Sequence, residues 1–170
     1  LFVMYLHGTS VFFMFVLMFG NYFLIAKLHN KIPYRFYQVI IWTVHIGILF
    51  VNDKNDGYRF SQIHPSLEFL QDAATGVLRW HVIFNMTTLR MIAYNYDIWE
   101  ARFHGPETRD RVEKKHKASC VDCASLPRGI PCYKRRTDSP HEFEEYGLLN
   151  YMAYMLYIPL FVGGPMSSFN

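Results

Sequence analysis

The sequence predicts an all-α, polytopic membrane protein with about four membrane helices, and two observations support this prediction. Of the 170 residues, 51% are hydrophobic and 18% are aromatic, yet the mean hydropathy is only +0.03, because apolar blocks alternate with charged segments. Residues 1–26 and 146–170 contain no charged side chain. Apolar stretches of about 20 residues are long enough to cross a bilayer as helices.

The first membrane helix is predicted at about residues 1–27. At about 1.5 Å per residue its uncharged part is roughly 39 Å long, which crosses the bilayer with some tilt and exceeds the apolar region of a signal peptide. The second helix is predicted at about residues 36–52. It follows Pro33 and ends at the polar run 52–56.

The third membrane helix is predicted at about residues 79–99, with polar side chains on two opposite sides. At about 100° per residue, one stripe holds His81, Asn85, Thr88 and Asn95, and the other holds Arg79, Arg90 and Asp97. Such a helix has no broad lipid face. An unpaired charge at mid-membrane costs from about 2.5 kcal/mol upward, so Arg90 is expected to face other helices or a wet cavity. The alternative is a structural arginine bonded to neighbouring carbonyls.

The fourth membrane helix, at about residues 146–164, is broken near its end. The break consists of Pro159, Gly163, Gly164 and Pro165. Irregular backbone at membrane depth is tolerated where it lines a cavity inside protein, so we expect this segment to lie beside one. His7 and His45 also lie in apolar segments, where we expect backbone partners rather than catalytic roles.

The basic residues predict which loops lie in the cytosol. Three separate the first two helices and ten more lie between Arg102 and Arg136, which places loop 100–145 in the cytosol and loop 53–78 on the exterior side. Aromatic and charged residues alternate in the exterior loop, which favours either a helix lying at the membrane interface or an ordinary connection. The net charge of +3 reflects this topology and does not indicate nucleic-acid binding.

All three cysteines of the chain lie in the cytosolic loop, close to a histidine. The group consists of His116, Cys120, Cys123 and Cys132. One His and three Cys can form a closed tetrahedral zinc site, and Cys-x-x-Cys is the usual chelating turn. Free thiols, or acylation of a cysteine near the membrane, are the alternatives. The neighbouring lysines and arginines form either a solvated face or a surface for phosphate groups and anionic lipids.

Several stretches, in this order, resemble one known family. They are Gly76 to Asn85 with Leu89 to Tyr94, the His116/Cys120/Cys123/Cys132-Tyr133 loop, and Tyr154 to Leu160 with Gly164-Pro165 and Ser168 to Asn170. Over about residues 36–170 the chain is similar to the membrane-bound O-acyltransferase (MBOAT) superfamily, in particular its Gup and hedgehog-acyltransferase-like branch. The chain starts without Met and stops inside a membrane segment, so we expect an internal fragment of an MBOAT helical bundle.

The resemblance implies an acyltransferase of the endoplasmic reticulum. It would transfer a fatty acyl group from acyl-CoA to a lipid, such as a lyso-GPI anchor or a glycerolipid, or to a secretory protein. The catalytic His of the family, with an Asn or Asp upstream of it, falls beyond Asn170, so no catalytic residue is assigned here. Expected partners are membrane lipids, acyl-CoA, the acceptor and the remaining helices of the same full-length chain.

Acyl transfer across a membrane needs a passage through the helix bundle, because the donor enters from the cytosol and the base must reach the acceptor hydroxyl. The residues expected to line that passage are Trp80, His81, Asn85, Arg90, Pro159, Gly163, Gly164 and Pro165.

Two other function classes fit the same residues. A catalytically inactive MBOAT-like scaffold would lack the downstream histidine, and a transporter would also use broken helices and charges inside the membrane. An S-acyltransferase with a zinc loop fits less well, because the Asp-His-His-Cys tetrad of those enzymes does not occur in the sequence.

Overall fold

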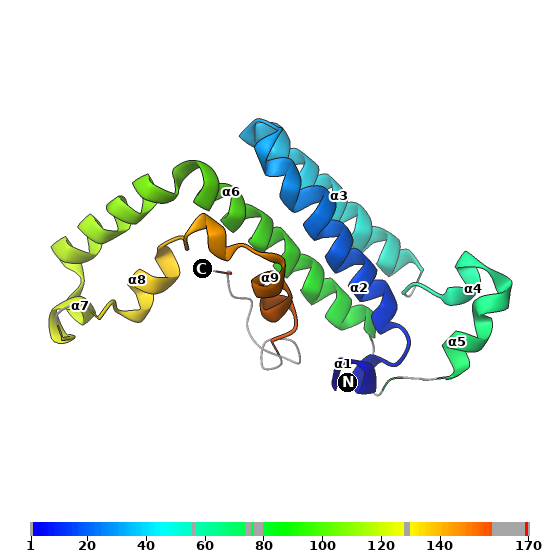
Figure 1. Cartoon of the computed structure of the whole chain (residues 1–170). Helices are drawn as coiled ribbons and strands as arrows, with labels where there is room; N and C mark the ends of the chain where they lie inside the picture. The colour runs from blue at the N-terminus through cyan, green and yellow to red at the C-terminus, as the bar shows by residue number, and fades with distance from the viewer. Residues whose placement is uncertain are drawn as a thin grey trace. The chain divides into compact units, whose positions relative to one another are not determined.

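Helices account for the regular structure of this protein. The computed structural model describes residues 2–55, 57–73, 76, 80–127, 130–157 and 169, and among these it contains helices and no strand (Figure 1). They divide into two compact units: the first runs to Ile92 and includes Tyr157, and the second runs from Ala93 to Leu156 and includes Phe169. The all-α prediction is confirmed.

The N-terminal apolar stretch, expected as one membrane helix over about residues 1–27, is divided by a turn into a short helix and a longer helical segment. Its elements are α1 (Phe2–His7), α2 (Val11–Gly20), the π-helical η1 (Asn21–Ile25) and the 3-10 helix η2 (Ala26–Asn30). Between α1 and α2, Gly8 has a φ of 59°, a left-handed conformation that glycine adopts without steric cost. The longer apolar helix therefore covers only Val11–Leu24.

The next helix, α3 (Tyr34–Lys54), covers the predicted second span. Among the described residues it is the one helix long and apolar enough to cross a bilayer. Ile41 and His45 lie on its buried stripe, whereas Phe36 and Phe50 on other sides are 66% and 67% exposed. An apolar surface of this kind suits contact with lipid or with further membrane helices. The other predicted crossings stay predictions.

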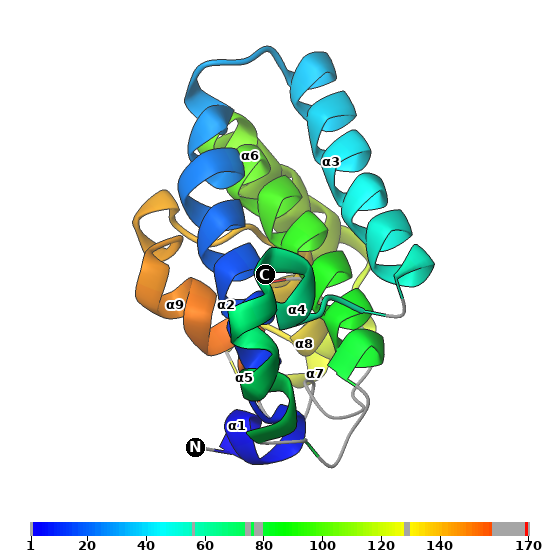
Figure 2. The ribbon, with the colours of Figure 1, turned by 90° about the vertical axis from the view of Figure 1, so that its right-hand side faces the viewer.

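Short helices connect α3 to the long helix α6 (Trp80–Ser119). They are α4 (Phe60–Ile63), the 3-10 helix η3 (Pro65–Leu67) and α5 (Glu68–Ala73). Phe60 is buried against Phe13 of α2, with ring centroids 4.6 Å apart, whereas Ile63 and Phe69 are more than half exposed. Helical turns thus form where an interfacial helix was expected, and their place at the interface stays a prediction. Figure 2 shows α2, α3 and the start of α6 running alongside one another.

Helix α6 is longer than the third predicted span, which was expected to end near residue 99. It continues to Ser119 because the charged segment after the span is rich in helix-forming Glu, Arg and Lys. An i,i+4 ion pair between Glu113 and Lys117, 2.7 Å long, supports its last turns. Pro106 lies inside the helix. The charged residues thus marked the end of the apolar segment near residue 99, but not the end of the helix at Ser119.

The second unit is built around Tyr94 of α6, which is fully buried. Its hydroxyl donates a hydrogen bond to the Tyr146 carbonyl oxygen at 2.8 Å, and its ring centroid lies 4.6 Å from that of Tyr151. Phe169 packs edge-on against the same ring at 5.2 Å. The unit also contains α7 (Val121–Ser125), α8 (Tyr133–Asp138), the 3-10 helix η4 (Phe143–Glu145) and α9 (Leu148–Met155).

The fourth predicted span is described only in its first part. Helix α9 covers eight residues of it. The break formed by Pro159, Gly163, Gly164 and Pro165 lies outside the described residues.

Candidate metal centre and buried polar helix

The end of α6 and the loop that follows bring the four predicted metal ligands together. His116 lies in the last turn of α6, and Cys120 follows where the helix has ended and the backbone is extended. Cys123 lies on α7, and Cys132 directly precedes α8. The four predicted ligands thus come from one reversal of the chain between α6 and α8.

The four side chains point their ligand atoms at a common centre. These atoms all lie within 4.8 Å of one another. The Cys120 and Cys132 sulfurs are 3.8 Å apart, and His116 Nδ1 lies 3.7 Å from Cys123 Sγ and 3.6 Å from Cys132 Sγ. A tetrahedral zinc ion with Zn–S of about 2.3 Å and Zn–N of about 2.0 Å would separate its ligand atoms by roughly 3.5 to 3.8 Å. The spacing therefore fits zinc.

Two of the four predicted ligands make a further contact with α8. The backbone N–H of Arg135 donates to Cys132 Sγ at 3.3 Å, so the first turn of α8 is tied to one ligand. On the far side of the imidazole, Asp138 Oδ2 lies 3.7 Å from His116 Nε2. His116 is 4% exposed, and among the described residues its Nε2 makes no hydrogen bond.

The thiols differ in acidity. The hydrogen bond from the Cys123 backbone, followed by the one from His116, lowers the pKa of Cys120 to about 7. The hydrogen bond with the Cys132 side chain, with burial second, raises the pKa of Cys123. Thiolates are the form that binds metal, and the lowered pKa of Cys120 favours this form.

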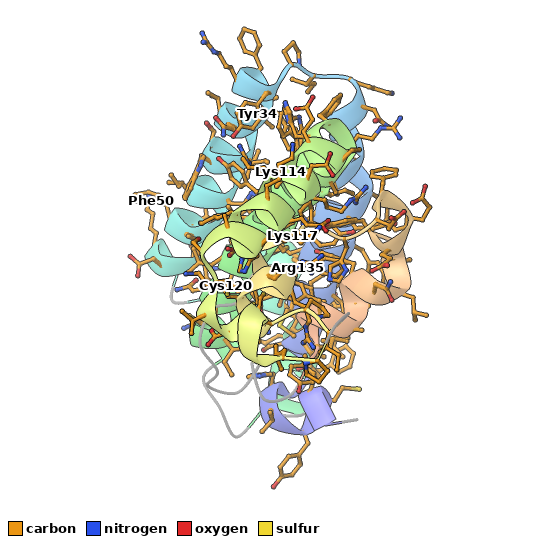
Figure 3. The ribbon with its side chains drawn as sticks, turned by 90° about the vertical axis from the view of Figure 1, so that its left-hand side faces the viewer. Tyr34, Phe50, Lys114, Lys117, Cys120 and Arg135 are labelled. Atoms are coloured by element: carbon orange, nitrogen blue, oxygen red, sulfur yellow. The ribbon has the colours of Figure 1, made fainter. Side chains whose placement is uncertain are left out.

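A basic surface surrounds the cluster. Figure 3 shows Lys114, Lys117, Cys120 and Arg135 on the face of the molecule turned to the viewer. A cavity of about 280 Å³ beside Cys120 is lined in part by Lys115 and Lys134. Positive charge of this density offsets the negative charge that three thiolates would add, and it attracts phosphate groups.

Several polar side chains in the apolar part of α6 are buried within the protein. Arg90 is 3% exposed and Thr88 is fully buried. Asn85 Oδ1 accepts a hydrogen bond from Asn52 Nδ2 of α3 at 2.8 Å, a contact between two helices within the first unit. The buried arginine and the bonded asparagine agree with a helix that has no lipid face.

Six of the eight predicted lining residues have side chains outside the described part of the chain. The side chains of Trp80 and His81, like the four residues of the terminal break, lie outside the part of the chain that the structure describes. A lining role for the whole predicted set therefore stays a prediction. His45 has the expected backbone partner, because its Nδ1 lies 2.8 Å from the Ile41 carbonyl oxygen. His7 is buried beside Gly76, where any added side chain would collide with the backbone of α1.

Two residues of the site escaped the sequence analysis. Asp138 contacts His116 only because α8 folds back on α6, and no spacing rule predicts a partner across a loop of that length. Asn52 was read as part of the polar run that ends the second span, whereas its side chain pairs with Asn85. An asparagine just inside an apolar span was the available signal for that role.

Comparisons with known proteins extend this picture. The chain is 33% identical, over its whole length, to a Schizosaccharomyces pombe protein named membrane-bound O-acyltransferase gup1, of which it covers 27%. It is 33% identical over 80% of its length to GUP1 of Saccharomyces cerevisiae, and 30% identical over 76% to GUP2 of that yeast, covering 23% of each. The chain thus spans about a quarter of the length of these relatives. No family model and no solved structure matches it.

Proposed function

Because the chain belongs to the Gup branch of the membrane-bound O-acyltransferase superfamily, we propose that the protein carrying it transfers a fatty acyl group from acyl-CoA to an acceptor hydroxyl. The acceptor is a lipid, such as a lyso-GPI anchor or a glycerolipid, or a secretory protein. The protein is an integral membrane protein, and we place it in the endoplasmic reticulum. The observation that supports this proposal is the 33% identity to an O-acyltransferase across all 170 residues.

The described residues contribute to this activity through the polar helix. Arg90 is almost completely buried, and a buried arginine is retained only where partners satisfy its charge. In the proposed enzyme Arg90 and Asn85 belong to the wall of the passage in which donor and acceptor meet. The general-base histidine and its Asn or Asp partner come from outside residues 1–170.

The test is acyl transfer by membranes that contain the full-length protein, with labelled acyl-CoA and each acceptor class in turn. Activity above that of membranes without the protein supports the proposal. Membranes that hold the inserted protein and show no transfer to any acceptor class would favour the inactive scaffold instead.

A variant series asks whether the polar helix takes part. Arg90→Leu should lower turnover about tenfold or more, which corresponds to about 1.4 kcal/mol of transition-state stabilisation, while insertion into the membrane is unchanged. Arg90→Lys should retain part of the activity, because it keeps the charge. Met86→Leu is the matched control, since Met86 lies one turn earlier on α6 and is 39% exposed. Wild-type turnover in Arg90→Leu would assign Arg90 a purely structural role.

We also propose that His116, Cys120, Cys123 and Cys132 hold a structural zinc ion. The observation that supports it is the convergence of four ligand atoms within 4.8 Å. Four protein ligands fill a tetrahedral zinc ion and leave no position for substrate, so the ion would order the loop and take no part in chemistry. Elemental analysis of the purified full-length protein should find one zinc per chain. Zinc at background level in protein purified without chelator would refute the site.

A further inference from the structure

We propose that Asp138 is a positioning residue of this metal centre: it accepts a hydrogen bond from the ligand His116 and thereby holds the C-terminal end of α8 against α6. The inference rests on the zinc site proposed above. Asp138 is the last residue of α8, and its Oδ2 lies 3.7 Å from His116 Nε2, on the side of the ring opposite the thiols.

The imidazole ring shows which nitrogen faces which partner. Nδ1 lies within 3.7 Å of two cysteine sulfurs, so it is the nitrogen that faces the metal position. A neutral imidazole that binds metal through Nδ1 must carry its proton on Nε2. That proton points toward Asp138, and among the described residues Nε2 has no other hydrogen-bond acceptor.

A carboxylate in this position does three things for a metal-binding histidine. It accepts the Nε2–H, which selects the tautomer that leaves Nδ1 free for the metal; it fixes the orientation of the ring; and it raises the basicity of the ligand. A formed hydrogen bond needs about 2.7 to 3.2 Å, so the separation of 3.7 Å would have to shorten by about 0.5 Å or more when the metal is bound.

The arrangement holds α8 at both of its ends. Cys132 precedes the helix as a ligand and accepts a hydrogen bond from the Arg135 N–H, while Asp138 closes the helix against His116. Arg135 also lies 3.8 Å from Glu113 of α6. With the metal bound, both ends of α8 would therefore be linked to the last turns of α6 through the metal centre, in addition to the ion pair between Arg135 and Glu113.

The charges around the site favour this role. A zinc ion with three thiolates and a neutral histidine has a net charge of −1, and Asp138 adds another negative charge. Lys115 and Lys134 line the cavity beside the cluster, together with Asp122, and they compensate in part for this charge, whereas Arg135 is paired with Glu113. The two lysines lower the electrostatic cost of placing the Asp138 carboxylate near three thiolates.

The experiment measures zinc affinity of the purified full-length protein by competition with a chromophoric chelator. Asp138→Ala should bind zinc about 10- to 100-fold more weakly than the wild type, the range found when outer-shell partners of metal ligands are removed. Asp138→Glu should recover part of this loss. Asp110→Ala removes the same charge from an exposed position on α6 and should bind zinc as the wild type does.

The absorption spectrum of the cobalt-substituted protein distinguishes a positioning role of Asp138 from a role as a metal ligand. It also shows whether the site is still folded in each variant. Asp138→Ala should keep the thiolate-to-cobalt absorption of the wild type, because the four ligands remain, whereas His116→Ala should change the ligand-field bands. Wild-type zinc affinity in Asp138→Ala would overturn the role of Asp138 and leave the zinc site standing. A wild-type protein that binds no zinc would overturn both. A changed cobalt spectrum in Asp138→Glu as well as Asp138→Ala would make Asp138 a ligand and contradict a positioning role.

Discussion

The hydroxyl of Tyr94 offers a sharp test of how the second unit is held together. Tyr94→Phe removes one oxygen atom and leaves the ring contacts with Tyr151 and Phe169 in place. It leaves the Tyr146 carbonyl without the hydrogen bond of 2.8 Å that it now accepts. We therefore expect Tyr94→Phe to lower the free energy of unfolding by about 1–3 kcal/mol, the usual cost when a buried polar group loses a hydrogen bond.

Tyr94→Ala removes the whole ring from a site with no solvent exposure. Truncating a buried aromatic side chain costs about 3–5 kcal/mol, so this variant should be clearly less stable than Tyr94→Phe. The assay is thermal or denaturant unfolding of the full-length protein in detergent, with Tyr157→Phe as the control because Tyr157 is 56% exposed. If Tyr94→Phe and Tyr157→Phe unfold alike, the hydrogen bond does not contribute and the reasoning is refuted.

Two more predictions follow from the first unit. Gly76→Ala should destabilise the protein by about 1–3 kcal/mol, because its Cβ would collide with the backbone of Leu6 and His7. The control is Gly47→Ala on α3, whose Cβ would meet no atom within 4 Å, so this variant should be neutral or stabilising. Equal thermal midpoints for the two variants would contradict the close packing at Gly76. Asn52→Ala and Asn85→Ala should show a coupling energy of about 0.5–3 kcal/mol in a double-mutant cycle of unfolding, whereas strictly additive losses would argue against their hydrogen bond.

The sequence predicted those features that depend on local pattern. The helix α3 appeared within two residues of its predicted ends, because Pro33 and the polar run after Val51 mark its limits. The Cys/His cluster formed because a ligand in the last helical turn and a Cys-x-x-Cys turn bring their atoms together through short-range geometry.

The sequence analysis missed two local features and two contacts between distant segments. The turn at Gly8 divides an apolar run that has no charge or proline to signal a break. Helix α6 extends past its apolar part because charged residues form helices as well as apolar ones do. Asp138 and Asn52 found their partners only through the folding of distant segments onto each other.

Because two of the cysteine sulfurs lie close together, the state of these thiols depends on the side of the membrane on which the loop lies. The Cys120 and Cys132 sulfurs are 3.8 Å apart, so a modest side-chain movement would allow a bond of about 2.05 Å between them if no metal were bound. Oxidation of this kind is expected in the lumen, whereas cytosolic reductants keep thiols free. In protein freed of metal, the redox state of these sulfurs in intact organelles would therefore report which compartment the basic loop occupies, without any engineered tag.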